Sequence, residues 1–85
     1  MRVVYEAKAM KDLKSIDAVA RKAILSKIVQ YAAAPDSFAN NVKRLQGSAF
    51  YRLRVGDYRV IFSLDGDLTV IMTIIRVRHR REAYE

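Results

Sequence analysis

The chain has 85 residues, of which 52% are hydrophobic, and it carries a formal net charge of +7. This length corresponds to one domain over residues 1–85 with one small core. The absence of cysteine and the presence of a single histidine exclude disulfide scaffolds, thiolate metal sites and multi-histidine metal sites. The uncharged run Leu68–Ile75 is far shorter than the roughly 20 residues that span a bilayer, and charges interrupt Met1–Met10, where a signal peptide would be apolar. We therefore expect a cytoplasmic domain without a membrane segment, metal or other cofactor.

Positive charge is distributed unevenly along the chain. All six lysines lie at or before Lys43, whereas eight of the ten arginines lie from Arg44 onward. A strongly basic small domain favours a polyanionic partner such as RNA, DNA or an acidic protein. Because a guanidinium holds phosphate at two points and an ammonium acts as a point charge, the arginines favour phosphate contacts in the second half of the chain. An ordinary solvated basic surface is the alternative.

The first half of the chain predicts one strand followed by two helices. The β-prone segment Val3–Tyr5 indicates the strand, and apolar residues at helical spacing over Glu6–Ser15 indicate the first helix. Asp17 is suited to cap the N-terminus of a second helix, and Pro35 is expected to end it, because the residue before proline resists the helical conformation. Residues 36–48 are polar and rich in turn formers, so they predict a loop, with a short helical continuation near its end as the alternative.

The second half predicts three strands joined by tight turns. Hydrophobic and polar residues alternate over Phe50–Val55 and over Tyr58–Leu64. Gly56–Asp57 predicts a hairpin turn with glycine in the first position, as a type II′ turn requires. After a second turn at Asp65–Asp67, the run Leu68–Val77 is apolar at successive positions, which indicates a central strand covered on both faces.

The predicted fold is therefore α+β with the order β-α-α-β-β-β, in which two N-terminal helices pack on one face of a small, mainly antiparallel four-stranded sheet. Strand alternation assigns Tyr51 and Tyr58 to the core face together with the aliphatic residues of their strands. The opposite face receives three arginines from the predicted hairpin: Arg52, Arg54 and Arg59. Together with the arginine-rich C-terminus, they predict a concave basic patch.

Two segments resemble a known family. The run YRLRVGDYRVIF over residues 51–62 and the run RHRREAY over residues 78–84 closely resemble the RelE branch of the RelE/ParE toxin superfamily. The resemblance implies a toxin of a type II toxin–antitoxin pair. RelE-type members enter the ribosomal A site and cut mRNA, whereas ParE-type members share the fold and inhibit DNA gyrase. The implied partners are a cognate antitoxin, the ribosome and its mRNA, with the antitoxin complex binding its own operator DNA.

The resemblance also implies a catalytic pattern at Arg52, Arg54, Arg59, Arg78 and Tyr84. Several RelE proteins have lysine at the positions that match Arg52 and Arg54. An arginine is not deprotonated in proteins, so a base at either position in those relatives must be supplied by another residue here. This departure keeps open a catalytically degenerate homologue that binds nucleic acid.

RNA can be cut without a metal when its own 2′-hydroxyl attacks the phosphate. The reaction needs a base, an acid and cations around the phosphorane, and the arginines suit the last role. Tyr84, from the resemblance, and His79, whose ordinary pKa is about 6.5, are the candidates for proton transfer. The remaining cations of the second half are predicted to bind RNA: Lys43, Arg44, Arg76, Arg80 and Arg81. The alternative functions are a ParE-type gyrase inhibitor without nuclease activity and a small nucleic-acid-binding module.

Overall fold

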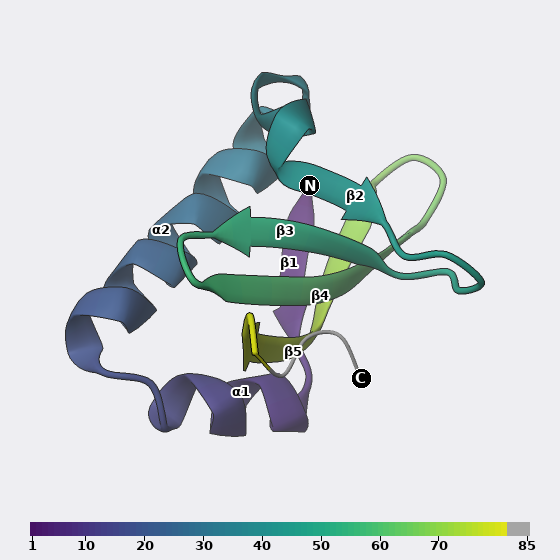
Figure 1. Ribbon diagram of the computed structural model, residues 1–85. Coiled ribbons are helices and arrows are strands. Elements are labelled where there is room, and N and C mark those ends of the chain that lie inside the picture. Colours follow the sequence, from purple (N-terminus) through teal and green to yellow (C-terminus); the bar gives the residue numbers. More distant parts are fainter. Residues whose placement is uncertain (82–85) are drawn as a thin grey trace.

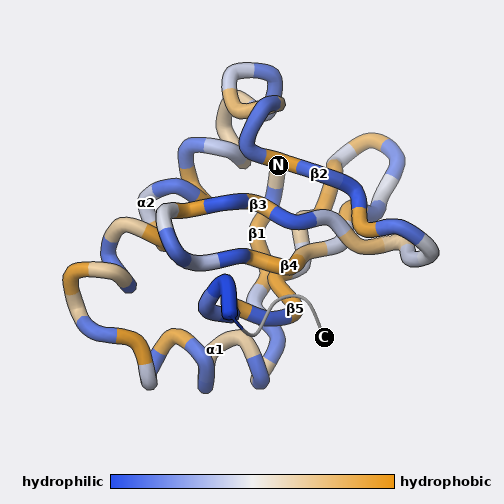
Figure 2. Tube along the Cα trace, in the orientation of Figure 1, coloured by the Kyte–Doolittle hydropathy of each residue, from blue (hydrophilic) through white to orange (hydrophobic). Residues whose placement is uncertain are grey.

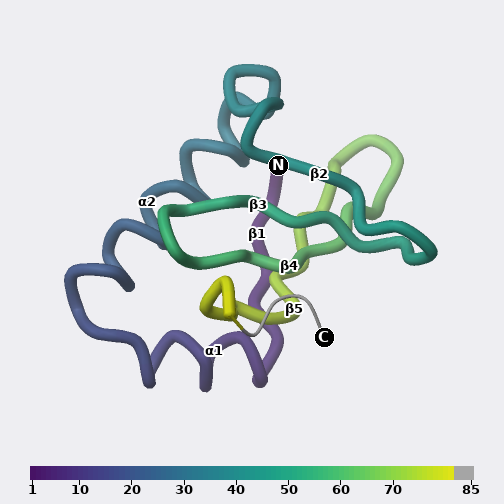
Figure 3. Tube along the Cα trace, viewed as in Figure 1, coloured from purple at the N-terminus to yellow at the C-terminus, as the bar shows by residue number. Residues whose placement is uncertain are grey.

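The computed structural model describes residues 1–81. Figure 1 shows the helices and strands, and Figure 3 traces the chain through them from the N-terminus. The elements in chain order are β1 (Arg2–Tyr5), α1 (Ala7–Lys14), α2 (Ala18–Ala33), the 3₁₀ helix η1 (Pro35–Asn41), β2 (Val42–Arg44), β3 (Tyr51–Val55), β4 (Tyr58–Asp65) and β5 (Ile71–His79).

The strands form a single sheet in the order β1-β5-β4-β3-β2. β1 runs parallel to β5, and the other neighbours are antiparallel. The predicted α+β architecture is confirmed, but the sheet has five strands rather than four, because β2 pairs with β3 at the edge. The predicted loop over residues 36–48 thus contains all but the first residue of η1 and the whole of β2. A three-residue strand is too short to show an alternating pattern, so its pairing arises from the tertiary structure rather than from a local signal.

The two predicted helices are present with their expected boundaries. The Asp17 carboxylate accepts a hydrogen bond from the Ala20 amide at 3.1 Å, which caps α2 at its N-terminus. α2 ends before Pro35, and this proline then lies in the first turn of η1, where its missing N–H costs nothing. Arg21 donates to the carbonyls of Leu13 and Ile16, each at 3.2 Å, so the start of α2 holds the end of α1.

The core lies between the two helices and one face of the sheet. Within residues 1–81, twelve buried hydrophobic residues form it: Ala9, Leu13, Ile24, Ile28, Tyr31, Ala32, Leu53, Val60, Phe62, Met72, Ile74 and Val77. The Phe62 ring lies 5.4 Å from that of Tyr31 and 5.5 Å from that of Tyr51. Tyr51 and Tyr58 pack against this core as predicted. Figure 2 shows the alternation of hydropathy along the central strands and the hydrophilic character of β2.

β5 corrects the prediction of a strand covered on both faces. Leu68 lies fully exposed in the turn before the strand, which begins at Ile71. Met72, Ile74 and Val77 are buried, whereas Thr73 and Ile75 between them are partly exposed. The apolar run therefore reflects a strand with neighbours along both edges, not one with layers on both faces. No helix within residues 1–81 is long and apolar enough to cross a membrane.

Candidate active site

Three arginines form a row across three neighbouring strands of the sheet. Arg54 on β3 is the register partner of Arg59 on β4, and Arg59 is the partner of Arg78 on β5. The adjacent pairs Leu53–Val60 and Val60–Val77 are buried against the helices, so strand alternation places the three arginines on the opposite, open face. Residues directly opposite each other have Cβ atoms about 4.5–5.5 Å apart. We call Arg54, Arg59 and Arg78 the arginine row.

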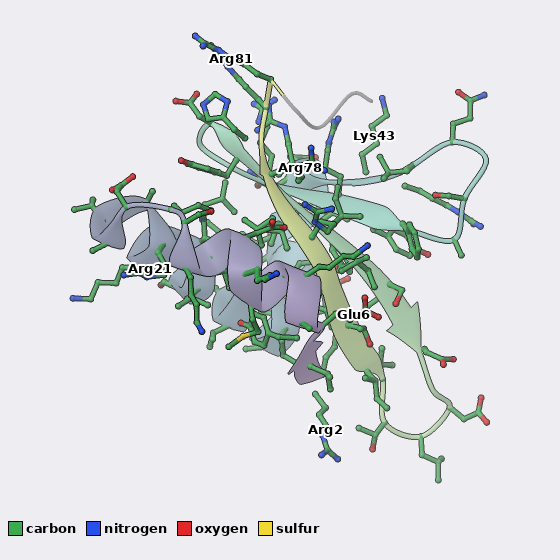
Figure 4. All side chains as sticks on the ribbon, turned by 90° about the horizontal axis from the view of Figure 1, so that it is seen from below. Arg2, Glu6, Arg21, Lys43, Arg78 and Arg81 are labelled. Carbon is green, nitrogen blue, oxygen red and sulfur yellow. The ribbon has the colours of Figure 1, made fainter. Side chains whose placement is uncertain are left out.

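Two further cations lie beside this row on the open face. Lys43 on β2 pairs with Arg52 on β3, and Arg52 lies two residues before Arg54 on the same strand. Figure 4 shows Lys43 and Arg78 on the same side of the sheet and Arg21 on the side of the helices. The structure therefore brings together, on one face, the four arginines that the sequence assigns to phosphate contact.

Arg59 is the fixed centre of the row. Its side chain folds toward the β3–β4 turn, where Nη1 donates to the carbonyls of Gly56 and Tyr58, each at 3.0 Å. The residue is only 7% exposed, and its Nε is buried without a hydrogen-bond partner among the described residues. A buried unsatisfied donor is costly, and because this Nε has almost no accessible surface, an anionic oxygen can approach the guanidinium only at its other nitrogens.

The other arginines of the face surround this fixed centre with more accessible charge. Arg54 is exposed, whereas Arg52 and Arg78 are half-buried. A rigid buried cation flanked by accessible cations suits a site that neutralises several oxygens of one phosphate group, because fixed charges need not reorganise as negative charge develops. Among residues 1–81, no three histidine, cysteine, aspartate or glutamate side chains are grouped so that they could hold a metal ion.

Arg76 makes a different contact from the RNA contact predicted for it. Its Nε donates to Asp12 Oδ2 at 2.8 Å and its Nη2 to Asp12 Oδ1 at 3.1 Å, a bidentate ion pair between β5 and α1. Asp12 Oδ2 also accepts the Val77 amide at 2.9 Å. Partial burial alone would raise the pKa of Asp12, but these hydrogen bonds and the charges of Arg76 and Arg78 outweigh it and hold the pKa below its ordinary value.

His79 follows Arg78 on β5 and lies opposite Tyr58. It is the register partner of Tyr58, whose ring packs on the core face, and the two rings meet edge to face at 5.3 Å. Its Nδ1 accepts the Arg81 amide at 3.3 Å. Strand alternation points the His79 ring to the other side of β5 from Arg78. His79 nevertheless lines, with Arg76, Arg78, Asp12 and Tyr58, a pocket between the end of α1 and β5.

The remaining predicted residues are distributed around the sheet. Arg44 pairs with Tyr51, so it alternates with Lys43 and belongs to the opposite side of the edge strand. The Arg80 amide donates to the Asp57 carbonyl at 2.7 Å, and its side chain forms an exposed ion pair with Asp57 at 3.8 Å. Arg81 is exposed after the end of β5. Tyr84 lies outside the described residues.

Asp12 is the residue that the sequence reasoning did not find. It joins α1 to β5 through both Arg76 and the Val77 backbone, 64 and 65 positions further along the chain. In the sequence it is one polar residue between lysines on the exposed side of a short helix, and no local pattern distinguishes it from a solvated charge.

Comparisons with known proteins place this geometry in a family. The family model described as the ParE toxin of the type II toxin–antitoxin system parDE matches residues 3–84. The chain belongs to the RelE/ParE superfamily of type II toxin–antitoxin toxins. Among curated relatives, Toxin RelE3 of Methanocaldococcus jannaschii is 32% identical over 88 residues, which cover all of this chain and 97% of that protein.

Solved structures of RelE proteins share the fold of this toxin. The RelB–RelE antitoxin–toxin complex of Methanococcus jannaschii contains a chain with a TM-score of 0.72 and 29% identity, over 96% of this chain and 95% of that one. The archaeal RelE–RelB complex of Pyrococcus horikoshii contains a chain with a TM-score of 0.74 and 26% identity, over 95% of this chain and 96% of that one. The resemblance found in the sequence is thus confirmed at the level of family and fold.

Proposed function

We propose that this toxin is a ribosome-dependent endoribonuclease that cleaves mRNA in the A site by attack of the RNA 2′-hydroxyl on the adjacent phosphate. The arginine row is the observation that carries the proposal, because three cations in direct register on adjacent strands create a strong positive field at one point of the open face. A pentacoordinate phosphorane concentrates negative charge at such a point, and fixed donors directed at developing charge are usually the largest catalytic contribution.

The residues take distinct roles in this proposal. Arg59, held by two backbone carbonyls, is the fixed ligand of a non-bridging phosphate oxygen. Arg54 and Arg78 flank it, and Arg52 and Lys43 extend the contact along the RNA backbone. We assign proton transfer first to Tyr84, on the strength of the family resemblance. His79 is the second candidate: its ring lies beside Tyr58, and it lines one pocket with Arg76 and Arg78. Arginine at positions 52 and 54 cannot take the role of base.

The proposed partners follow from the relatives and from the charge. RelE proteins of two archaea are seen in complexes with RelB antitoxins. We propose a cognate antitoxin for this toxin as well, with an acidic segment that covers the arginine row and so blocks access to RNA. Coupled folding of such a segment allows it to wrap a large surface. The toxin would act in the cytoplasm, and the antitoxin complex would bind its own operator DNA.

Induction in growing cells followed by mapping of mRNA 5′ ends tests the nuclease activity. The expected result is new 5′ ends inside translated codons, which disappear when translation is blocked beforehand. Arg78→Ala should abolish these ends while the protein stays folded. Arg2→Ala is the matched control, because Arg2 is an exposed arginine on β1, opposite Ile71 rather than another cation. Growth arrest without codon-internal ends, or undiminished cleavage by the Arg78→Ala variant, would overturn the proposal.

The second candidate function is inhibition of DNA gyrase, which the family description favours because it names ParE. This activity requires binding and no catalysis. It predicts continued translation after induction, together with a rising DNA-damage response and the loss of supercoiling by purified gyrase. Since RNA cleavage is absent in this case, the same 5′-end map distinguishes the two candidates. A degenerate homologue that only binds nucleic acid would give neither cleavage nor gyrase inhibition.

A further inference from the structure

The end of β5 that carries Arg78 has a neighbouring strand, β4, along only one of its two edges. β1 pairs with β5 from Ile71 to Ile74, and its last residue, Tyr5, is the partner of Ile74. Beyond that point α1 lies against the open edge of β5 (Figure 1). The Val77 amide on this edge donates to the Asp12 carboxylate at 2.9 Å, so a side chain of α1 replaces the missing strand as the acceptor.

The same segment follows an irregularity in the sheet. Ile61 pairs with Arg76 but Phe62 pairs with Ile74, so Ile75 is an extra residue in β5. A bulge of this kind changes the direction of the strand and the aim of the side chains that follow it. Asp12 binds the side chain of Arg76 and the backbone of Val77, which are the first two residues after the bulge. Arg78 comes next in the chain.

Repulsion between like charges also acts on the segment of β5 that follows the bulge. Arg78 lies opposite Arg59, and like charges directly opposite each other on a sheet repel. Asp12 is an acidic group close to both arginines, and the charge of Arg78 lowers its pKa as that of Arg76 does. Its side chain is 16% exposed, so water screens this attraction less than it would at the surface.

We propose that Asp12 is a positioning residue for Arg78: by holding Arg76 and the Val77 amide, it fixes the strand segment after the bulge so that Arg78 completes the arginine row. As an element of catalysis this rests on the proposed ribonuclease function. In this proposal Asp12 acts on Arg78 and not on the substrate. Its effect on the site passes through the backbone of β5, which distinguishes it from the arginines of the open face.

Nuclear magnetic resonance of the purified toxin tests the positioning directly. We expect Asp12→Ala to raise the hydrogen-exchange rate of the Val77 amide at least about tenfold, since its acceptor is lost, and to increase the picosecond–nanosecond motion of the Arg78 Nε–H group. Ala9→Gly is the control, because it weakens the packing of the same helix without touching the Asp12 contacts. Unchanged Arg78 motion in Asp12→Ala, or an equal increase in Ala9→Gly, would overturn the proposal.

Cleavage of mRNA on purified ribosomes gives a second readout. Removal of a group that orients a metal ligand typically costs about 10–100-fold in activity. By analogy, we expect a loss of this size in kcat for Asp12→Ala, with little change in KM. The double variant Asp12→Asn/Arg76→Gln restores a neutral hydrogen-bonded pair and should recover much of this loss. A loss of equal size in Ala9→Gly, or the lack of any recovery in the double variant, contradicts the positioning role. If the wild-type toxin cleaves no RNA, the proposed function fails, and the motion of Arg78 still decides the role of Asp12.

Discussion

Arg59 and Arg78 lie directly opposite each other on β4 and β5, so two cations share one cross-strand position. Arg54 on β3 lies opposite Arg59 on its other side, so the row of cations continues onto a third strand. Opposite charges at such positions stabilise a sheet, whereas like charges destabilise it. An arrangement that stability alone would disfavour supports our proposal that this part of the sheet binds an anion, since sites shaped for function commonly carry such a cost.

Replacement of Arg54, the exposed member of the arginine row, should stabilise the free toxin. We expect Arg54→Thr to raise the free energy of unfolding by about 0.2–1 kcal/mol, because it relieves repulsion with Arg59 and threonine suits a strand. Urea denaturation at low ionic strength measures the change. Arg2→Thr is the control, since Arg2 lies opposite Ile71, and it should give no comparable gain. A loss of stability in Arg54→Thr would show that the repulsion between the two arginines is already offset.

The pattern of residues 51–64 was sufficient to predict the face that carries the arginines. A hairpin with a tight turn fixes its own register, and Gly56 takes the positive φ of +58° that the predicted turn requires. Once Leu53 and Val60 are assigned to the core, Arg52, Arg54 and Arg59 follow on the other face by alternation. The family and the order of the main elements could therefore be inferred from local signals.

Features that depend on pairing between distant segments were not predictable in the same way. β2 is defined by its contact with β3, and the Asp12–Arg76 pair joins residues 64 positions apart. The intrinsic pKa of histidine makes His79 a candidate, but only the register of β4 and β5 shows that it lies opposite Tyr58. A bulge shifts that register by one residue, and one residue changes the face of a side chain.

Low pH should weaken the contact that Asp12 on α1 makes with Arg76 and Val77 on β5. The pKa of Asp12 is lower in the folded protein than its unfolded value of about 3.9, so its contribution is fully present above pH 4 to 5 and disappears as the pH falls through the folded pKa. We expect Asp12→Asn to lose about 1.5–3 kcal/mol of stability at pH 7, as typical for hydrogen bonds to a charged group. Urea midpoints of wild type and variant should converge below about pH 4.

The control for this pH dependence is Asp67→Asn, which changes an exposed carboxylate in the turn after β4. This variant should have a stability close to that of the wild type at pH 7. A gap between wild type and Asp12→Asn that stayed constant down to pH 3 would mean that the charge of Asp12 contributes nothing beyond a neutral hydrogen bond.

The turn between β4 and β5 should tolerate substitution poorly at Gly66. Its φ is +104°, and a Cβ at this position would collide with the backbone carbonyl oxygen of Thr69. Gly47 also has a positive φ, +74°, but its Cβ would meet open space. We expect Gly47→Ala to cost about 1–2 kcal/mol, the ordinary penalty of the left-handed conformation, and Gly66→Ala to cost more, because backbone must move. Equal urea midpoints for the two variants would contradict this steric argument.

The salt dependence of RNA binding should show which side of the edge strand β2 contacts RNA. Lys43 and Arg44 are adjacent and both exposed, but Lys43 pairs with Arg52 on the open face and Arg44 pairs with Tyr51 on the other. For single-stranded RNA, each phosphate contact contributes about 0.7 to the slope of log K against log salt concentration. We therefore expect Lys43→Ala to reduce the magnitude of the slope for a short single-stranded RNA by about 0.7, and Arg44→Ala to leave it unchanged. Fluorescence anisotropy over a range of salt concentrations measures both slopes. Equal reductions in the two variants would mean that RNA contacts the rim of the sheet rather than the face that carries the arginine row.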